Sequence, residues 1–268
     1  VRVPGTPILQ DGRPSFDVAQ AGSEIALCWA ANFTGNYTDP DKYYLEFLSG
    51  TIGAGGITWD QICTICLLNK TSGEWHGGLA LAADGTAYVA RQSTWTIDYW
   101  PSGEGNRSRV VTYKKSSIEN SFTEFPNPFD GAYSPAYPLN GILSLVPVFV
   151  ARSDGSVMLI VDFSDPTSGN DRLMWSTYVP NVMSWEPNTD TYSCWHEQLE
   201  NPGTFSVCAD ALGNSHVAFW TSNNHVGYAR LSPDGSAVKN VFGFQDKWPS
   251  ISLDNSDALH IVFASYGN

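Results

Sequence analysis

One pattern occurs five times in the chain, and this repetition restricts the fold more than any other feature. Each copy has a Pro or Gly, an alternating apolar segment, a polar turn and a second alternating segment. Apolar residues at every second position on both sides of a turn predict a β-hairpin. The copies are RPSFDVAQAGSEIALCWA from Arg13, HGGLALAADGTAYVA from His76, VPVFVARSDGSVMLIVDF from Val146, PGTFSVCADALGNSHVAFW from Pro202 and WPSISLDNSDALHIVFA from Trp248.

Further strand-like segments follow the hairpins. A third strand is expected in KYYLEFLSG, SRVVTYKKSS, RLMWSTYV and HVGYARLS, and a fourth in ITWDQICTICLL and SAVKNVFGF. Four antiparallel strands that recur roughly every 45 to 70 residues are typical of β-propeller blades. The sequence therefore predicts a single all-β domain over residues 1–268, a β-propeller of about five blades of four antiparallel strands. A solenoid would have shorter and more even repeats, and a sandwich would not repeat one hairpin five times.

The two ends of the chain resemble each other. LQDGRPSFDVA from Leu9 matches FQDKWPSISLD from Phe244, so Val1–Gln10 aligns with Val238–Gln245, the end of the fourth unit. We expect Val1–Gln10 to be an outer strand that closes the last blade, because closure removes free sheet edges. No third strand is evident for that blade: either Val1–Pro4 contributes to it, or the chain is an excerpt of a longer protein with more blades.

The last two hairpins, FSVCADALGNSHVAFW and PSISLDNSDALHIVFA, resemble the repeat of sialidase-like and lectin-like β-propellers. In that repeat a Pro-Ser-apolar strand precedes Asp-x-x-Gly-x-x-His and a Tyr-centred third strand. The resemblance implies an architecture, which proteins of many functions share. The His of the repeat is His216 or His260, whereas Tyr88, Met158 and Ala26 stand at the equivalent places. We interpret this position as a packing site.

The motifs of the catalytic relatives are missing. A sialidase would carry an arginine triad and a Ser-x-Asp-x-Gly-x-x-Trp turn, and neither is evident. Arabinanase-like hydrolases have their base in Asp-Pro-Ser, where this chain has Arg13, although Asp11 and Asp17 lie nearby. We therefore favour a protein that is not an enzyme. A propeller glycoside hydrolase or polysaccharide lyase is the alternative, and the attachment head of a fibre or filament is a third hypothesis.

Charge, the length of apolar segments and cysteine usage argue against nucleic-acid binding, a membrane span and a cysteine metal site. A net charge of −13 argues against nucleic acid, and we interpret Arg107, Arg109, Lys114 and Lys115 as a solvated strand face. No apolar segment approaches the roughly 18 to 20 residues that span a bilayer. Cys63 and Cys66 form CxxC in a predicted strand, where positions i and i+3 point to opposite faces, so buried thiols are favoured over a metal site. A Cys194–Cys208 disulfide remains open.

The loops between second and third strands contain the candidate ligand site. They are rich in Asp, Asn, Trp and Tyr, which suit sugar binding, so the expected partner is a glycan or glycoprotein. The 17-residue loop Arg91–Arg107 is predicted to fold over one end of the propeller. The candidate ligand-binding residues are Trp95, Asp98, Tyr99, Trp100, Asn223 and His225.

Two further expectations concern a metal and the location of the protein. Asp162, Asp165 and Asp171, with Asn170, could hold calcium through hard oxygen ligands, although their spacing is not that of an EF-hand. No other cofactor is expected. The chain begins at Val1 without Met, which indicates a removed leader or an excerpt, and four N-glycosylation sequons are compatible with secretion. We expect a secreted or surface protein.

Overall fold

The computed structural model describes residues 16–31, 42–69, 77–99, 103–127, 145–165, 170–186, 205–220, 225–232, 237–254 and 256–265. Apart from one 3-10 turn at Pro180–Val182, the regular elements of this part are strands. They are β1 (Phe16–Ala21), β2 (Glu24–Ala31), β3 (Lys42–Gly53), β4 (Gly56–Trp59), β5 (Cys63–Asn69), β6 (Gly77–Leu81), β7 (Ala87–Tyr99), β8 (Gly103–Lys115), β9 (Thr123–Phe125), β10 (Leu145–Ala151), β11 (Val157–Asp165), β12 (Asn170–Val179), β13 (Ser184–Glu186), β14 (Phe205–Ala209), β15 (Ser215–Trp220), β16 (His225–Leu231), β17 (Ala237–Leu253) and β18 (Leu259–Ser265). The predicted all-β class is confirmed.

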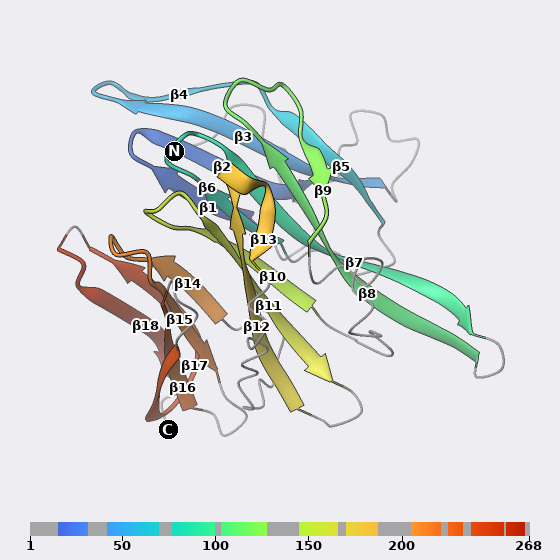
Figure 1. Cartoon of the computed structure of the whole chain (residues 1–268), viewed down its shortest axis with the longest axis vertical. Coiled ribbons are helices and arrows are strands. Elements are labelled where there is room, and N and C mark those ends of the chain that lie inside the picture. The colour runs from blue at the N-terminus through green and yellow to red at the C-terminus, as the bar shows by residue number, and fades with distance from the viewer. Residues whose placement is uncertain are drawn as a thin grey trace.

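The described strands form four antiparallel sheets that follow one another in chain order (Figure 1). They contain β1–β5, β6–β9, β10–β13 and β14–β18. The first strands of successive sheets lie against each other, β1 on β6, β6 on β10 and β10 on β14. No helix in the described part is long and apolar enough to cross a membrane.

All five predicted hairpins are present: β1–β2, β6–β7, β10–β11, β14–β15 and β17–β18. The turn of the β1–β2 hairpin has Gly22 in the left-handed region, at φ of 59°. The other four hairpins share one pattern of backbone hydrogen bonds, also with one turn residue in that region. That residue is Gly85, Gly155 or Gly213, at φ of 81°, 82° and 81°, and Asp257 at 59° in the last hairpin. Glycine suits this conformation because it has no Cβ to clash. The Gly/Asp/Ser chemistry that indicated turns is thus explained by backbone geometry.

Apolar clusters fill the spaces between successive sheets. One lies between β1–β5 and β6–β9 and includes Phe47 and Val89, another contains Tyr88 and Phe149, and a third contains Phe219. The sheets approach so closely that a Cβ on Gly78 of β6 would lie 2.4 Å from Val148 Cα of β10. Packing between sheet faces therefore joins the repeats.

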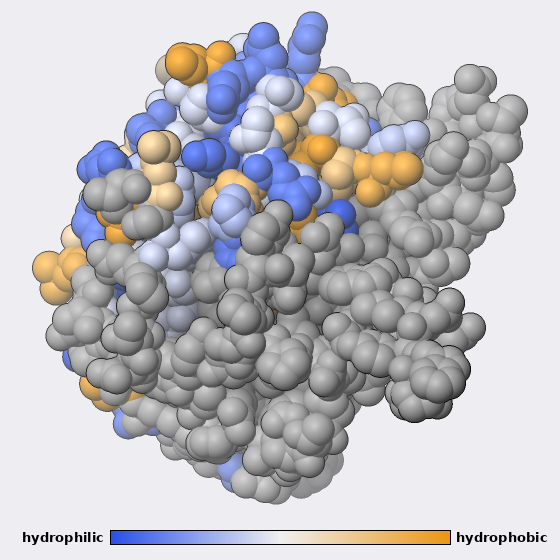
Figure 2. All heavy atoms as spheres, turned by 45° about the vertical axis from the view of Figure 1, so that its right-hand side comes forward, coloured by the Kyte–Doolittle hydropathy of each residue, from blue (hydrophilic) through white to orange (hydrophobic). Residues whose placement is uncertain are grey.

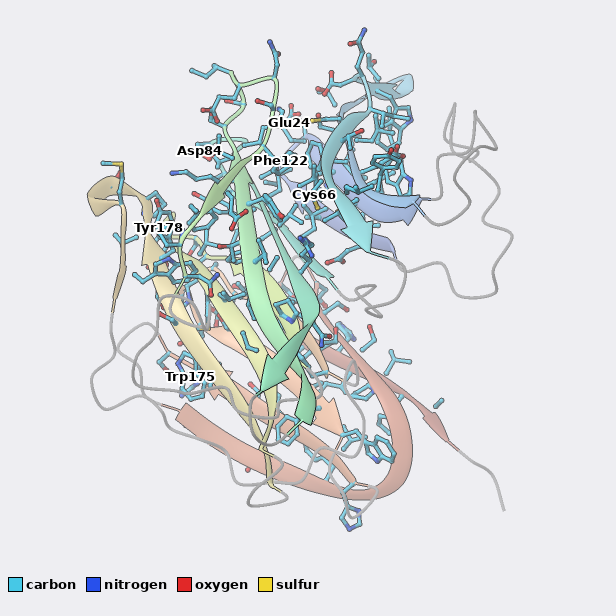
Figure 3. All side chains as sticks on the ribbon, turned by 90° about the vertical axis from the view of Figure 1, so that its right-hand side faces the viewer. Glu24, Cys66, Asp84, Phe122, Trp175 and Tyr178 are labelled. Atoms are coloured by element: carbon cyan, nitrogen blue, oxygen red, sulfur yellow. The ribbon has the colours of Figure 1, made fainter. Side chains whose placement is uncertain are left out.

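A β-bulge corrects the expectation for the two neighbouring cysteines. Cys63 pairs with Phe47 and Cys66 with Leu45, and the register of β5 shifts between these pairs. The extra residue cancels the alternation, since a bulge places two residues opposite one. Both cysteines consequently pack against the same cluster, as does Phe122; Cys66 and Phe122 are labelled in Figure 3. The interpretation as strand cysteines holds, but the expectation of opposite faces is wrong. Cys194 lies outside the described residues.

Strand β17 belongs to two hairpin systems. Its residues 237–245 pair with β16, and its residues 246–253 pair with β18. Among the described strands β18 pairs with β17 alone, so this last hairpin has no third strand there. The described strands do not confirm a count of five blades. Val1–Gln10, which we expect to close the last blade, lies outside the described residues.

Candidate functional site

The predicted loop Arg91–Arg107 is not a loop. Residues 91–99 belong to β7 and residues 103–107 to β8, and the two strands stay in register from Ala87↔Lys115 to Tyr99↔Gly103. Alternating Thr, Trp, Ile and Tyr in this segment favour extended backbone. The distal half of the pair, residues 93–99 and 103–109, extends beyond the neighbouring strands at the lower right of Figure 1. We call this half the arm.

The register divides the arm into two faces of different chemistry. Trp95 is opposite Arg107, Ser93 opposite Arg109 and Tyr99 opposite Gly103. Cross-strand partners and every second residue of a strand share a face. Trp95, Tyr99, Arg107 and Arg109 are therefore on one face, which we call the aromatic face.

The other face of the arm is polar and acidic. Thr96 is opposite Asn106, and Asp98 is opposite Glu104. Asp98 was expected among the aromatic residues as an acceptor for sugar hydroxyls. The strand alternation instead assigns Asp98 to the face opposite Trp95 and Tyr99, which corrects that expectation.

The aromatic face continues a face of the core. Nearer the body, Val89, Val111 and Tyr113 of the same strand face pack against the β1–β5 sheet. Arg91 is buried there and donates from Nε to the Tyr113 hydroxyl at 3.3 Å and from Nη1 to the Gln92 carbonyl at 3.5 Å. Burial raises the pKa of Tyr113 to about 12. Arg91 thus has an internal structural role.

The remaining predicted site residues are dispersed over the fold. Trp100 and Asn223 lie outside the described residues, and His225 is half-buried at the start of β16, beside a register shift. Asp162 and Asp165 are on β11 and Asp171 is on β12, with Asp165 opposite Asn170. The calcium site stays a prediction. Among the described residues searched, no three His, Cys, Asp or Glu side chains gather in a way that could hold a metal ion.

Two buried carboxyl groups belong to the first sheet: Asp17, which the sequence places near the position of the arabinanase base, and Glu46, which the sequence analysis did not single out. Asp17 Oδ2 accepts a hydrogen bond from the Leu79 backbone N–H at 2.7 Å, which links β1 to β6, and burial raises its pKa. Glu46 is buried on β3 opposite Trp29, and burial raises its pKa as well. The sequence signal for such buried carboxyl groups is an acidic residue within an otherwise apolar strand.

These two carboxyl groups do not form a glycosidase pair. Asp17 is opposite Cys28, and Cys28 is opposite Phe47, which places Asp17 on the sheet face that packs against β6. Glu46 is the neighbour of Phe47 along β3 and therefore belongs to the other face. A glycosidase needs both carboxyl groups on the two sides of one bond, about 5 to 9.5 Å apart. A sheet lies between Asp17 and Glu46.

His216, at the His position of the repeat, has a structural role in the β14–β15 hairpin. His216 Nε2 is 3.0 Å from Asp210 Oδ2, and its Nδ1 is hydrogen-bonded to the Tyr228 hydroxyl at 2.7 Å. Burial raises the pKa of Asp210, but hydrogen bonds from Asn214 and His216 outweigh it and leave the pKa below its usual value. Both ring nitrogens of His216 have internal partners, as a packing role requires.

Comparisons with known proteins support the architecture. Neither a protein-family model nor a curated protein matches the sequence. Among solved structures, AofleA from Arthrobotrys oligospora has a TM-score of 0.55 at 12% identity, over 95% of this chain and 66% of its own. The polysaccharide lyase Uly1 has a TM-score of 0.55 at 10% identity, over 95% of this chain and 55% of its own.

A third solved structure comes from Fusarium graminearum. Its GH93 α-L-arabinofuranosidase, in complex with arabinobiose, has a TM-score of 0.50 at 10% identity, over 90% of this chain and 67% of its own. The chain thus spans between 55% and 67% of the lengths of the three structures. At such low identity the likeness concerns the fold. It supports a β-propeller-like arrangement of antiparallel sheets.

Proposed function

We propose that this chain is a carbohydrate-binding, lectin-like β-propeller of about five blades, from a secreted or surface protein, which binds glycan without cleaving it. The observation that carries the proposal is the aromatic face of the arm, where Trp95 and Tyr99 alternate on one strand. The names of two similar structures, a polysaccharide lyase and an arabinofuranosidase, support carbohydrate as the ligand class.

The chemistry of the aromatic face suits a sugar. Planar rings stack on the apolar C–H face of a pyranose, and an extended ribbon can present two rings to consecutive sugar units. Positions 95 and 99 are four residues apart, which corresponds to about 13 Å along a strand. Each ring is expected to contribute roughly 0.5 to 1.5 kcal/mol beyond area burial.

A double substitution tests the binding site. Trp95→Ala with Trp100→Ala should weaken glycan binding about tenfold or more on a glycan array and in calorimetry, with little change in melting temperature. Ile118→Ala is the matched control, because Ile118 is 91% exposed between β8 and β9 and removes apolar surface elsewhere. Unchanged affinity together with a large loss of stability would show that these rings pack within the fold and would end the proposal.

A reducing-sugar assay on the same glycans separates binding from cleavage. The proposal expects bound ligand without release of reducing ends. Release by the parent chain would favour a glycoside hydrolase, and release with formation of unsaturated products would favour a lyase. Retained protein binding without any glycan binding would favour the attachment-head hypothesis.

A further inference from the structure

We propose that the outer edge of β18 binds an extended strand of a partner protein, which places a tyrosine opposite Val262 and its hydroxyl on His260. The proposal concerns a protein partner and does not depend on the glycan. Its basis is the internal repeat. The first four hairpins are each joined by a third strand, namely β3, β8, β12 and β16, whereas β18 pairs with β17 alone among the described strands. Figure 1 shows β18 at the lower left margin of the molecule.

The last two hairpins correspond position by position because their turns are closed in the same way. In each turn the N–H of an aspartate, Asp210 or Asp254, donates to the carbonyl of the residue four positions later at 3.0 Å. The sixth residue after that aspartate is a histidine in both hairpins, His216 or His260, and it lies 3.0 Å from the aspartate carboxylate. The surroundings of the first histidine therefore indicate what the second one lacks.

Strand β16 supplies the additional contacts in the β14–β15 hairpin. Its Tyr228 is opposite Ala218, two residues after His216. The Tyr228 hydroxyl is 2.7 Å from Nδ1 of His216, and Ala218 is fully buried. The third strand thus gives the histidine a partner for its second ring nitrogen and adds backbone pairing along β15.

The corresponding positions of β18 are exposed. Val262, two residues after His260, is 68% exposed, and the side chain of His260 is 57% exposed. Asp254 Oδ2 contacts Nε2 of His260, but no described residue hydrogen-bonds its Nδ1. A tyrosine opposite Val262 would occupy the place that Tyr228 has on β16. It would reach His260 with its hydroxyl and cover Val262, and aromatic and β-branched residues are favourable cross-strand partners.

Strand β18 also lacks the features with which proteins usually protect the edge of a sheet. Such edges carry charged residues, proline or bulges. The strand, LHIVFAS, has no Lys, Arg, Asp, Glu, Pro or Gly. Residues 250–253 of β17 pair with residues 259–262 without a register shift, so this part of the hairpin is regular. A regular, uncharged edge suits strand addition, in which backbone hydrogen bonds give affinity and side-chain positions give specificity.

Two other occupants fit this edge less well. Val1–Gln10 is expected as the outermost strand of the last blade, which leaves the third position open. Its Pro4 and Pro7 lack the N–H that pairing on both sides requires, whereas proline is tolerated in an edge strand. A second copy of the chain would pair β18 with β18, and Leu259–Ser265 has no tyrosine for His260. A strand of another protein therefore suits the edge better.

The test uses a fluorescent peptide with the sequence of residues 224–232, NHVGYARLS, which contains β16. Fluorescence anisotropy should show that the parent chain binds this peptide, whereas a scrambled peptide does not bind. Phenylalanine in place of the tyrosine should weaken binding about two- to tenfold, the value expected for one hydrogen bond. The peptides change while the protein stays the same, so this comparison does not depend on the folding of any variant.

Three variants locate the site on β18. His260→Ala should bind the tyrosine and phenylalanine peptides equally, because the partner of the hydroxyl is removed. Val262→Lys should bind both peptides about tenfold or more weakly, since a charge on a sheet edge opposes strand addition. Val238→Lys is the matched control: Val238 is 47% exposed on the half of β17 that pairs with β16, and this variant should bind like the parent. Circular dichroism verifies that the strands of each variant persist.

Hydrogen exchange and sedimentation separate the three occupants. The peptide should protect amides of β18 and leave those of β15 unchanged. If the β18 amides of the parent alone are as protected as those of β15, the edge is already paired within the chain and the proposal is overturned. A dimer of the parent that Val262→Lys abolishes would assign the edge to a second copy and overturn it as well. So would a failure of the parent to bind the peptide, or equal binding of the tyrosine and phenylalanine peptides by the parent.

Discussion

His216 and His260 stand at the same position of two hairpins in different surroundings. Both are 3.0 Å from an aspartate of their own turn, Asp210 and Asp254. The side chain of His216 is 10% exposed beneath Tyr228 of β16, whereas that of His260 is 57% exposed. The third strand of the sheet makes this difference, because it encloses His216 and supplies the hydroxyl for its second ring nitrogen.

The first prediction concerns that hydroxyl. Tyr228→Phe should lower the free energy of unfolding by about 1 to 3 kcal/mol, because it leaves a buried ring nitrogen without its partner. His260→Ala, a change at the exposed copy of the position, should hardly alter stability. Urea unfolding measures both. Equal effects of the two substitutions would contradict the role assigned to β16.

The pKa values of Asp17 and Asp210 are shifted in opposite directions, so the two groups should make stability depend on pH in opposite ways. Burial raises the pKa of Asp17, so its contribution to stability is present at low pH and is lost as the pH rises through the folded pKa. Asp210 has a lowered pKa despite burial, so its contribution is present at higher pH and is lost as the pH falls.

Asp17→Asn and Asp210→Asn should therefore differ from the parent with opposite pH slopes. Across about pH 2 to about pH 7, parent stability relative to Asp17→Asn should fall as the pH rises above about 4, and parent stability relative to Asp210→Asn should fall as the pH drops below about 4. Urea unfolding across this range gives both differences. Parallel slopes would show that one of the two environments is wrongly described.

At the scale of elements, the arm extends beyond the neighbouring strands, and we expect the core to be stable without it. Replacing Thr94–Ser108 by Asn-Gly would join Ser93 to Arg109, which are paired residues, through a two-residue hairpin turn. The buried residues of β7 and β8 nearer the body remain. We expect the melting temperature to stay within about 4 °C of the parent and glycan binding to disappear. A large fall in the melting temperature would instead show that the arm contributes to the core.

The hairpins were predictable because each strand pair and its turn occupy one short segment. Features that depend on pairing with residues distant in the sequence could not be predicted in this way. The arm was assigned to a loop because Gly, Ser, Asn and Asp around Arg107 favour turns, yet pairing with TWTIDY extends both strands. One bulged residue in β5 reverses the expected faces of Cys63 and Cys66. Of the site, Trp95 and Tyr99 follow from the sequence, whereas Arg107 and Arg109 join them only through the register.

At the scale of the whole molecule, closure of the propeller remains a prediction. Exposed Val262, at 68%, and exposed His260 share the β18 strand, which pairs only with β17 among the described strands. Deleting Val1–Leu9 should leave the protein aggregated or markedly less stable, since an uncovered edge can pair with other chains. Light scattering and thermal melting test this, with a Gly-Ser replacement of equal length as the control. A truncated chain with the melting temperature of the parent would contradict the prediction that Val1–Gln10 closes the last blade.

The double role of β17 has a consequence for how the molecule opens. One uninterrupted strand pairs with β16 through its first half and with β18 through its second. The last hairpin and the sheet that encloses His216 therefore share one strand, with no loop between its two halves. Native-state hydrogen exchange should then assign the amides of residues 237–245 and 246–253 to a single cooperative opening unit, so the carboxyl-terminal repeats would exchange together although the sequence divides them into two.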